Sequence, residues 1–168
     1  MKPGEQLVGY VEEIYKGEPL ILVETGCLRR DGPEHEDADG WSTLYFARWA
    51  SKHEDCKFFS VDNDADHIRV AVNKLSEEKA LSSFPMFYFG ESVDFLKTLG
   101  RIDFAYLDSC DGWEHGLEEF KAAESKGARM IVMDDYISKV VYAAGYAASH
   151  GWQVKQEDRF TVMRKCTT

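Results

Sequence analysis

The sequence lacks three features that would point to common classes of protein. It has no apolar run near the roughly 20 residues that span a bilayer, and its polar start lacks the apolar core of a signal peptide. It has no cluster of basic residues, and its formal net charge of -10 would repel the phosphates of nucleic acids and an anionic membrane. Its 4 cysteines include no Cys-x-x-Cys pair, which favours reduced, packed thiols. We therefore expect a cytoplasmic protein with no nucleic-acid partner and no membrane partner.

The length limits the number of domains. The chain has 168 residues, of which 44% are hydrophobic, and this is enough for one sizeable core but too few for two ordinary domains. Residues 5–16 carry apolar side chains at helical spacing, which predicts an amphipathic helix within residues 1–18. We expect a single domain over residues 1–168.

Short apolar segments alternate with helical segments along the chain. Strands are expected at 20–25, 57–62, 86–89, 102–107 and 128–133, and helices at about 42–50, 65–78, 93–99, 113–125 and 138–149. Only residues 157–159 separate the two final strands, 152–156 and 160–164, so these strands form an antiparallel hairpin and not a crossover. The expected fold is α/β, with a mainly parallel sheet and a C-terminal antiparallel hairpin.

Acidic residues follow the expected strands at the point where each strand ends. The first strand ends at Glu24-Thr25-Gly26, the second at Asp62 and the fourth at Asp108. The carboxyl ends of parallel strands meet at one edge of a sheet, where open α/β sheets bind small ligands. We therefore expect the functional site at that edge.

This order of motifs resembles a class I S-adenosylmethionine-dependent methyltransferase, over about residues 19–165. The resemblance implies a three-layer, Rossmann-like methyltransferase fold. It implies that Glu24-Thr25-Gly26 approaches the methionine part of the cofactor, that Asp62, with its neighbour Asn63, holds the ribose, and that Gly90-Glu91-Ser92 meets the adenine. A carboxylate can accept two hydrogen bonds from a vicinal diol, and a glycine lets the backbone come close to a ligand. The alternative role for Asp62 is to cap the following helix.

The first loop departs from that family. The family packs two or three glycines directly after the first strand, whereas here the next glycine that is a candidate for this loop, Gly40, comes fourteen positions after Gly26. We infer that residues 28–39 are an inserted, lid-like loop and that Gly40-Trp41-Ser42 resumes the cofactor-binding loop. The alternative is a degenerate site that no longer binds the cofactor.

A narrower resemblance is to the branch of O-methyltransferases that uses a divalent metal. It implies that Asp108, Asp134 and Asp135 are oxygen ligands for Mg²⁺, which would neutralise three neighbouring carboxylates and lower the pKa of an acceptor hydroxyl. The alternative is that Asp134 or Asp135 caps the last helix and that Asp108 contacts the cofactor or shapes the pocket without a metal.

His115 follows the fourth strand, close to the expected reaction centre. Histidine can accept a proton at neutral pH, so His115 is the preferred general base, with Asp111 as the second choice and Asp108 as a further catalytic candidate. The alternative for His115 is a surface or capping residue.

The function expected from these motifs is methyl transfer from S-adenosylmethionine to a hydroxyl of a small molecule or sugar, with or without a metal. A homodimer would complete the cover over the acceptor. Two alternatives stay open: a catalytically silent Rossmann-like binding protein, and a nicotinamide-dependent oxidoreductase, against which the missing Gly-x-Gly-x-x-Gly argues.

Overall fold

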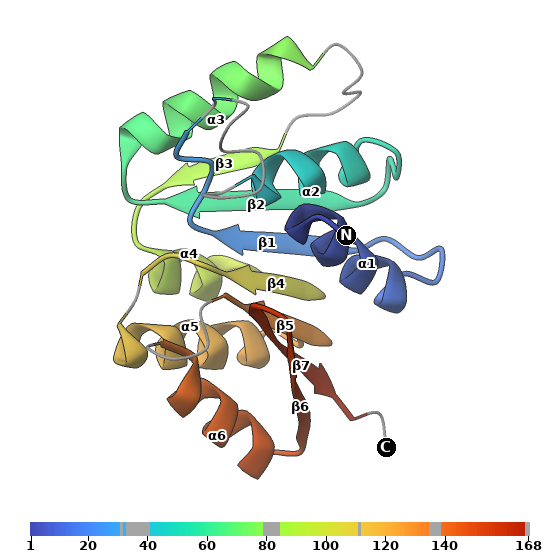
Figure 1. The fold of residues 1–168 in the computed structure, drawn as a ribbon, viewed down its shortest axis with the longest axis vertical. Helices are drawn as coiled ribbons and strands as arrows, with labels where there is room; N and C mark the ends of the chain where they lie inside the picture. The colour runs from blue at the N-terminus through green and yellow to red at the C-terminus, as the bar shows by residue number, and fades with distance from the viewer. Residues whose placement is uncertain (31, 33–40, 79–84, 111, 135–138, 167–168) are drawn as a thin grey trace.

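The protein folds around one seven-stranded sheet. The computed structural model describes residues 1–30, 32, 41–78, 85–110, 112–134 and 139–166. The elements in chain order are α1 (Pro3–Ile14), β1 (Ile21–Thr25), α2 (Ser42–Ala50), β2 (Lys57–Asp62), α3 (Ala65–Glu77), β3 (Met86–Phe89), α4 (Ser92–Thr98), β4 (Phe104–Leu107), α5 (Trp113–Ser125), β5 (Met130–Met133), α6 (Val141–Ser149), β6 (Trp152–Glu157) and β7 (Phe160–Lys165). The strand order is β3-β2-β1-β4-β5-β7-β6 (Figure 1).

The strands run parallel except at one end of the sheet. β1 pairs in parallel with both β2 and β4, and the parallel part extends to β3 on one side and β5 on the other. β7 pairs antiparallel with β5 and with β6, which confirms the predicted C-terminal hairpin. Successive strands are added toward one edge of the sheet from β1 to β3 and toward the other edge from β4 onward. In open α/β sheets, ligands bind in the crevice at this change of direction, which here lies between β1 and β4.

Helices cover both faces of the sheet. Alternate residues of each buried strand point to opposite faces, as in β4, where Phe104 and Tyr106 pack on one side and Ala105 and Leu107 on the other. The buried apolar side chains form two clusters, one on each face of the sheet. One cluster packs α1, α2 and α3 against the sheet, and the other packs α4, α5 and α6 against it (Figure 1). These are the three layers that the resemblance implies.

Most expected elements are present at the expected places. β4 and β5 each begin two residues later than predicted, at Phe104 and Met130, and α4 begins at Ser92. No helix in the described ranges is long and apolar enough to cross a membrane.

Candidate functional site

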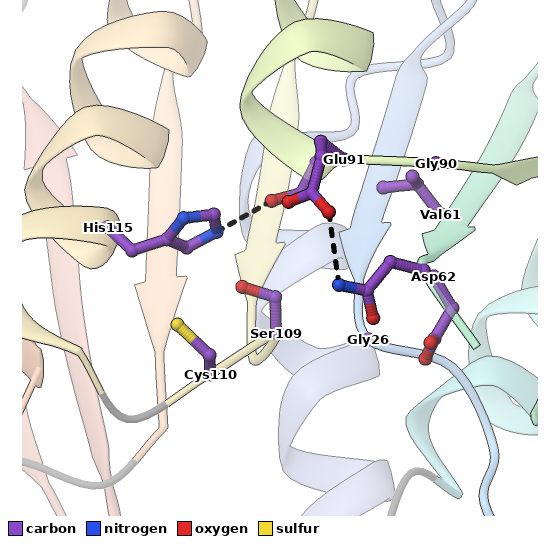
Figure 2. A pocket seen from close by; sticks show the side chains of 10 residues that line it. Gly26, Val61, Asp62, Gly90, Glu91, Ser109, Cys110 and His115 are labelled. Carbon is purple, nitrogen blue, oxygen red and sulfur yellow. Dashed lines mark hydrogen bonds between the residues drawn. The ribbon is translucent and has the colours of Figure 1, made fainter.

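A pocket lies at the carboxyl ends of β1, β2 and β4. The chain segments that line it are the loop after β1, the end of β2, the turn after β3, the loop after β4 and the start of α5 (Figure 2). The hollow measures about 450 Å³ with the open space at its mouth included, which is the size of a small-molecule site. Its lining residues are Gly26, Val61, Asp62, Asn63, Gly90, Glu91, Ser92, Ser109, Cys110 and His115. Seven of the sequence-predicted site residues are among them.

Gly26 brings the loop after β1 close to the end of β4. Its φ is 83°, a conformation that favours glycine, and its N–H donates to the Val61 carbonyl at 2.8 Å. A Cβ at this position would lie 2.4 Å from the Asp108 carbonyl oxygen. The bare backbone of Gly26 therefore allows this junction of strands at the pocket.

Asp62 ties two loops together while it lines the pocket. Its carboxylate accepts the N–H of Cys27 at 3.0 Å and the N–H of Asp64 at 2.8 Å, and it contacts the ring of His67 at 3.3 Å. The residue is 8% exposed. The predicted capping role belongs to a neighbour, because the N-cap of α3 is Asp64, whose side chain accepts the Asp66 N–H.

The turn after β3 forms the next wall. The Gly90 N–H donates to the Asp62 carbonyl at 3.0 Å, and the φ of Gly90 is 153°. The Asn63 amide donates to Glu91 Oε1 at 3.2 Å, which links the end of β2 to this turn (Figure 2). The structure thus brings the predicted ribose and adenine contacts together.

His115 lies beside that turn and is part of a buried polar network. Its Nε2 lies 2.9 Å from Ser92 Oγ and 3.4 Å from Glu119 Oε1, and Ser109 Oγ donates to the same Glu119 oxygen at 2.7 Å. The hydrogen bond to Glu119 raises the pKa of His115. Burial by itself would raise the pKa of Glu119, but the hydrogen bonds from His115, Ser92 and Ser109 outweigh burial and lower it.

Glu24 points away from the pocket, into the interior. Its carboxyl group accepts hydrogen bonds from Ser42, from Thr43 at 2.6 Å and from Ser60 at 2.9 Å, and it is fully buried. Burial is the main cause that raises the pKa of Glu24 to about 8. The Leu28 N–H donates to Thr43 Oγ1 at 3.0 Å. Glu24 therefore anchors both ends of the long first loop rather than lining the hollow.

The other predicted residues of the first loop also lie outside the pocket lining. Thr25 is buried and its Oγ1 accepts the Asp108 N–H at 3.2 Å. Trp41 is buried against the core, with Lys74 Nζ 5.7 Å from the centre of its ring. Gly40 and most of the predicted insertion 28–39 lie outside the described residues, as do Asp111 and Asp135.

Solved structures with a similar fold include methyltransferases. The magnesium protoporphyrin IX methyltransferase of Synechocystis PCC 6803, with bound S-adenosylmethionine, matches with a TM-score of 0.69 at 14% identity over 97% of this chain and 78% of that chain. The O-methyltransferase of Bacillus cereus, in complex with S-adenosylhomocysteine, matches with a TM-score of 0.69 at 16% identity over 98% and 82%. A protein of Corynebacterium glutamicum has a TM-score of 0.76 at 15% identity over 98% and 81%. No family model matches the sequence, and no curated protein matches it.

The chain has a methyltransferase fold. In this fold the pocket lies at the edge where the sequence resemblance implies the cofactor. Its chemistry suits a nucleoside, because a carboxylate, an amide and two glycine backbones face one hollow.

A divalent metal does not fit the two predicted ligands that the structure describes. Asp108 Oδ1 is 2.8 Å from Lys139 Nζ, and Arg159 donates to Asp134 through Nε at 2.7 Å and also through Nη2. Each carboxylate is therefore already paired with a cation of the chain. Within the described ranges no group of three or more His, Cys, Asp or Glu residues could hold a metal.

Several site residues were not among those predicted from the sequence. Ser109 and Cys110 directly follow Asp108, so extending the strand-end rule by two residues would have found them. Glu119 is four residues from His115 on the same helix, a spacing that predicts contact. Lys139 and Arg159 give no such local signal, because they meet Asp108 and Asp134 only through the tertiary fold.

Proposed function

We propose that the protein transfers a methyl group from S-adenosylmethionine to an oxygen atom of a small molecule. The observation that carries this proposal is that Gly26, Asp62 and Gly90, which come from three different strand ends, line one pocket. The fold supports it, since solved structures that share the fold hold S-adenosylmethionine or S-adenosylhomocysteine.

Asp62 and the turn after β3 would hold the adenosine half of the cofactor. Each oxygen of the Asp62 carboxylate accepts one backbone N–H and can accept a further hydrogen bond. The two oxygens can therefore also accept hydrogen bonds from the two ribose hydroxyls. Gly90-Glu91-Ser92 lies beside Asp62 and offers the adenine a wall with little side-chain bulk at Gly90.

His115 belongs to the same end of the pocket. Because its Nε2 bonds Ser92 at the start of α4, we assign it to adenine binding rather than to proton transfer. The general-base role that the sequence predicts for it is therefore not part of this proposal, and nothing in the structure tests that role. The second choice for that role, Asp111, lies outside the described residues.

The cofactor supplies, when bound, a methyl group on a positively charged sulfur. The chain would hold the acceptor so that its oxygen lies in line with that methyl, because orientation supplies much of the rate in such a displacement. The transfer would form an oxygen–carbon bond as the sulfur–carbon bond breaks, with S-adenosylhomocysteine as the second product and the hydroxyl proton released to solvent water. We place the acceptor toward the loop after β4, where Ser109 and Cys110 line the pocket next to Asp108, because the other end of the pocket is taken by the adenosine contacts. The acceptor we favour is a hydroxyl of a small molecule or sugar, and the likeness to an O-methyltransferase supports an oxygen acceptor.

Calorimetric titration with S-adenosylhomocysteine, S-adenosylmethionine and NAD tests the proposal. We expect both sulfur compounds to bind with one site per chain and NAD to give no saturable heat. His115→Ala should weaken S-adenosylhomocysteine binding, because it removes the partner of Ser92 at the adenine wall. Saturable NAD binding without binding of either sulfur compound would overturn the proposal in favour of an oxidoreductase. Binding of the sulfur compounds without turnover on any hydroxyl acceptor would indicate a silent binding protein.

A further inference from the structure

The ends of β4 and β5 carry two carboxylates that are neutralised from within the chain. Lys139 is 1% exposed, and its Nζ lies 2.8 Å from Asp108 Oδ1. The backbone around Lys139 is packed tightly against α5, since a Cβ added at Gly116 would lie 3.0 Å from the Lys139 carbonyl oxygen. The lysine is therefore held in place by packing and not only by its charge.

Asp134 is enclosed in the same way by a different element. It is 2% exposed, and Arg159 donates to both of its oxygens. Tyr106 Oη also donates to it, at 3.1 Å. Arg159 lies in the tight connection between β6 and β7, so the antiparallel hairpin delivers this guanidinium to the end of β5. A bidentate guanidinium–carboxylate pair satisfies the oxygens that a metal would need.

A third cation lies beside the first pair. The Arg29 guanidinium donates to the Asp108 carbonyl oxygen at 3.2 Å. Among the described residues, the carboxylates Asp108 and Asp134 are thus accompanied by Arg29, Lys139 and Arg159. A divalent cation here would be repelled by these three positive side chains of the described part of the chain. It would also have to displace two ion pairs, and each pair has at least one member that is almost fully buried.

We infer that Lys139 and Arg159 do the charge-neutralising work at the ends of β4 and β5 that a divalent metal does in metal-assisted methyl transfer, so that this chain binds no metal there. The inference rests on the proposed function for its chemical meaning: the acceptor oxygen would be oriented by cations of the chain. The claim that no metal binds at the ends of β4 and β5 depends only on the two ion pairs. Its test can therefore be separated from any test of methyl transfer.

The decisive measurement is Mn²⁺ binding to the wild-type protein, followed by the electron paramagnetic resonance signal of the free ion. Mn²⁺ favours the oxygen ligands and octahedral geometry that suit Mg²⁺, and it is easily observed. We expect no saturable binding that depends on Asp108 up to about 1 mM Mn²⁺, the weak end of protein sites for hard cations. Saturable binding that Asp108→Asn abolishes would overturn the inference. Binding that both Asp108→Asn and Asp134→Asn leave unchanged supports it, because such binding lies elsewhere, whereas binding that Asp134→Asn abolishes would overturn it.

Removing the positive charges of Lys139 and Arg159 should create an affinity for Mn²⁺ that the wild type lacks. We expect Lys139→Met/Arg159→Met to bind Mn²⁺ at least about tenfold more tightly than the wild type, since it leaves two carboxylates without their cations. Adding Asp108→Asn should remove that gain. The matched control is Lys121→Met, which removes one positive charge from an exposed pair with Glu118 and should change nothing. If the double variant binds no better than the wild type, the inference is wrong.

Two further measurements keep the outcomes distinct. Circular dichroism shows whether each variant is folded, and if the double variant does not fold, the wild-type comparison with Asp108→Asn still decides. S-adenosylhomocysteine titration of the wild type tests the proposed function separately. A protein that binds neither Mn²⁺ nor S-adenosylhomocysteine would refute the function and leave the ion-pair assignment standing.

Discussion

Asp62 serves the fold and the pocket with the same two oxygens. At the residue scale its carboxylate is fixed by the N–H groups of Cys27 and Asp64, so the loops after β1 and β2 hold it at the pocket wall. Backbone donors that orient a carboxylate in advance reduce the entropy that ligand binding must overcome. This is why a single acid at a strand end can be both a structural tie and a binding group.

Replacing Asp62 by Asn tests that double role. An amide nitrogen cannot accept the N–H that one carboxylate oxygen accepts, so we expect a loss of stability of about 1–3 kcal/mol for the unsatisfied buried donor. We expect the affinity for S-adenosylhomocysteine to fall roughly tenfold or more, because a hydrogen bond to a charged group contributes about 1.5–3 kcal/mol. Chemical denaturation and calorimetry measure the two effects separately.

Asp64→Asn is the matched control for this change. Asp64 caps α3 through the Asp66 N–H, its side chain is 50% exposed, and Asn caps helices about as well as Asp. Stability and affinity should both stay within about 0.5 kcal/mol of the wild type. Equal affinities for the two variants would count against the ribose contact of Asp62.

The residues at the strand ends show which features of the site a sequence pattern can predict. Asp62, Asn63 and Gly90 could be placed at the pocket because a strand end fixes where its next residue lies. Glu24 stands at an equally good position but turns inward, because the hydroxyls of Ser42, Thr43 and Ser60 surround it. Those hydroxyls come from α2 and β2, so the side to which Glu24 points depends on tertiary packing.

At the element scale, the function depends on how closely β1 and β4 approach at their carboxyl ends. The Asp108 N–H donates to the Thr25 carbonyl at 2.9 Å, and directly beyond this bond Gly26 passes the Asp108 carbonyl. The loop that carries Arg29 back to Asp108 begins at this crossing. A side chain on Gly26 would push these two strand ends apart.

Gly26→Ala should therefore destabilise the protein and weaken the site together. The positive φ strains any L side chain, and the added Cβ would lie 2.4 Å from backbone, which cannot move away as a side chain can. We expect a loss of roughly 1–3 kcal/mol in the free energy of unfolding, the usual cost of one strained residue, and weaker S-adenosylhomocysteine binding. Denaturation by urea and calorimetry measure these.

Gly145→Ala is the control for Gly26→Ala, and we expect it to change the stability in the opposite direction. Gly145 lies exposed within α6, and an added Cβ meets nothing within 4 Å. Ala favours a helix over Gly by about 0.8–1.0 kcal/mol, so this variant should be more stable than the wild type. If Gly26→Ala and Gly145→Ala lose stability to the same extent, then Gly26 is not required for the close approach of β1 and β4.

Element boundaries were predicted more completely than the contacts between elements. Strand and helix positions follow from apolar periodicity and from turn residues, which are local. The pairing of Arg159 with Asp134 needs β7 to insert between β5 and β6, and no local pattern states which strand lies next to β5. The three carboxylates therefore predicted a metal, whereas two of them meet cations that the fold delivers.

At the scale of the whole molecule, buried ionisable groups make stability depend on pH. The burial of Glu24 raises its pKa from 4.5 to about 8, so the folded protein keeps a proton there that the unfolded chain releases above about pH 4.5. Unfolding then releases a proton, and the free energy of unfolding contributed by Glu24 decreases as the pH rises from about 4.5 to 8. Burial also raises the pKa of Asp108, which acts in the same direction. Glu119, whose pKa is lowered, acts in the opposite direction and loses its contribution under acid conditions.

Glu24→Gln isolates the first contribution. A glutamine side chain is neutral at every pH and can still accept hydroxyl donors through its carbonyl oxygen, so the ties to Thr43 and Ser60 can persist. Relative to this variant, the wild type should lose up to about 1.4 kcal/mol of stability for each pH unit between pH 5 and 8. Urea denaturation of both proteins across this range gives the difference curve, in which the groups common to both proteins cancel. A flat difference curve would show that Glu24 is ionised in the folded protein, and the first loop would then be anchored by a buried charge instead of a buried acid.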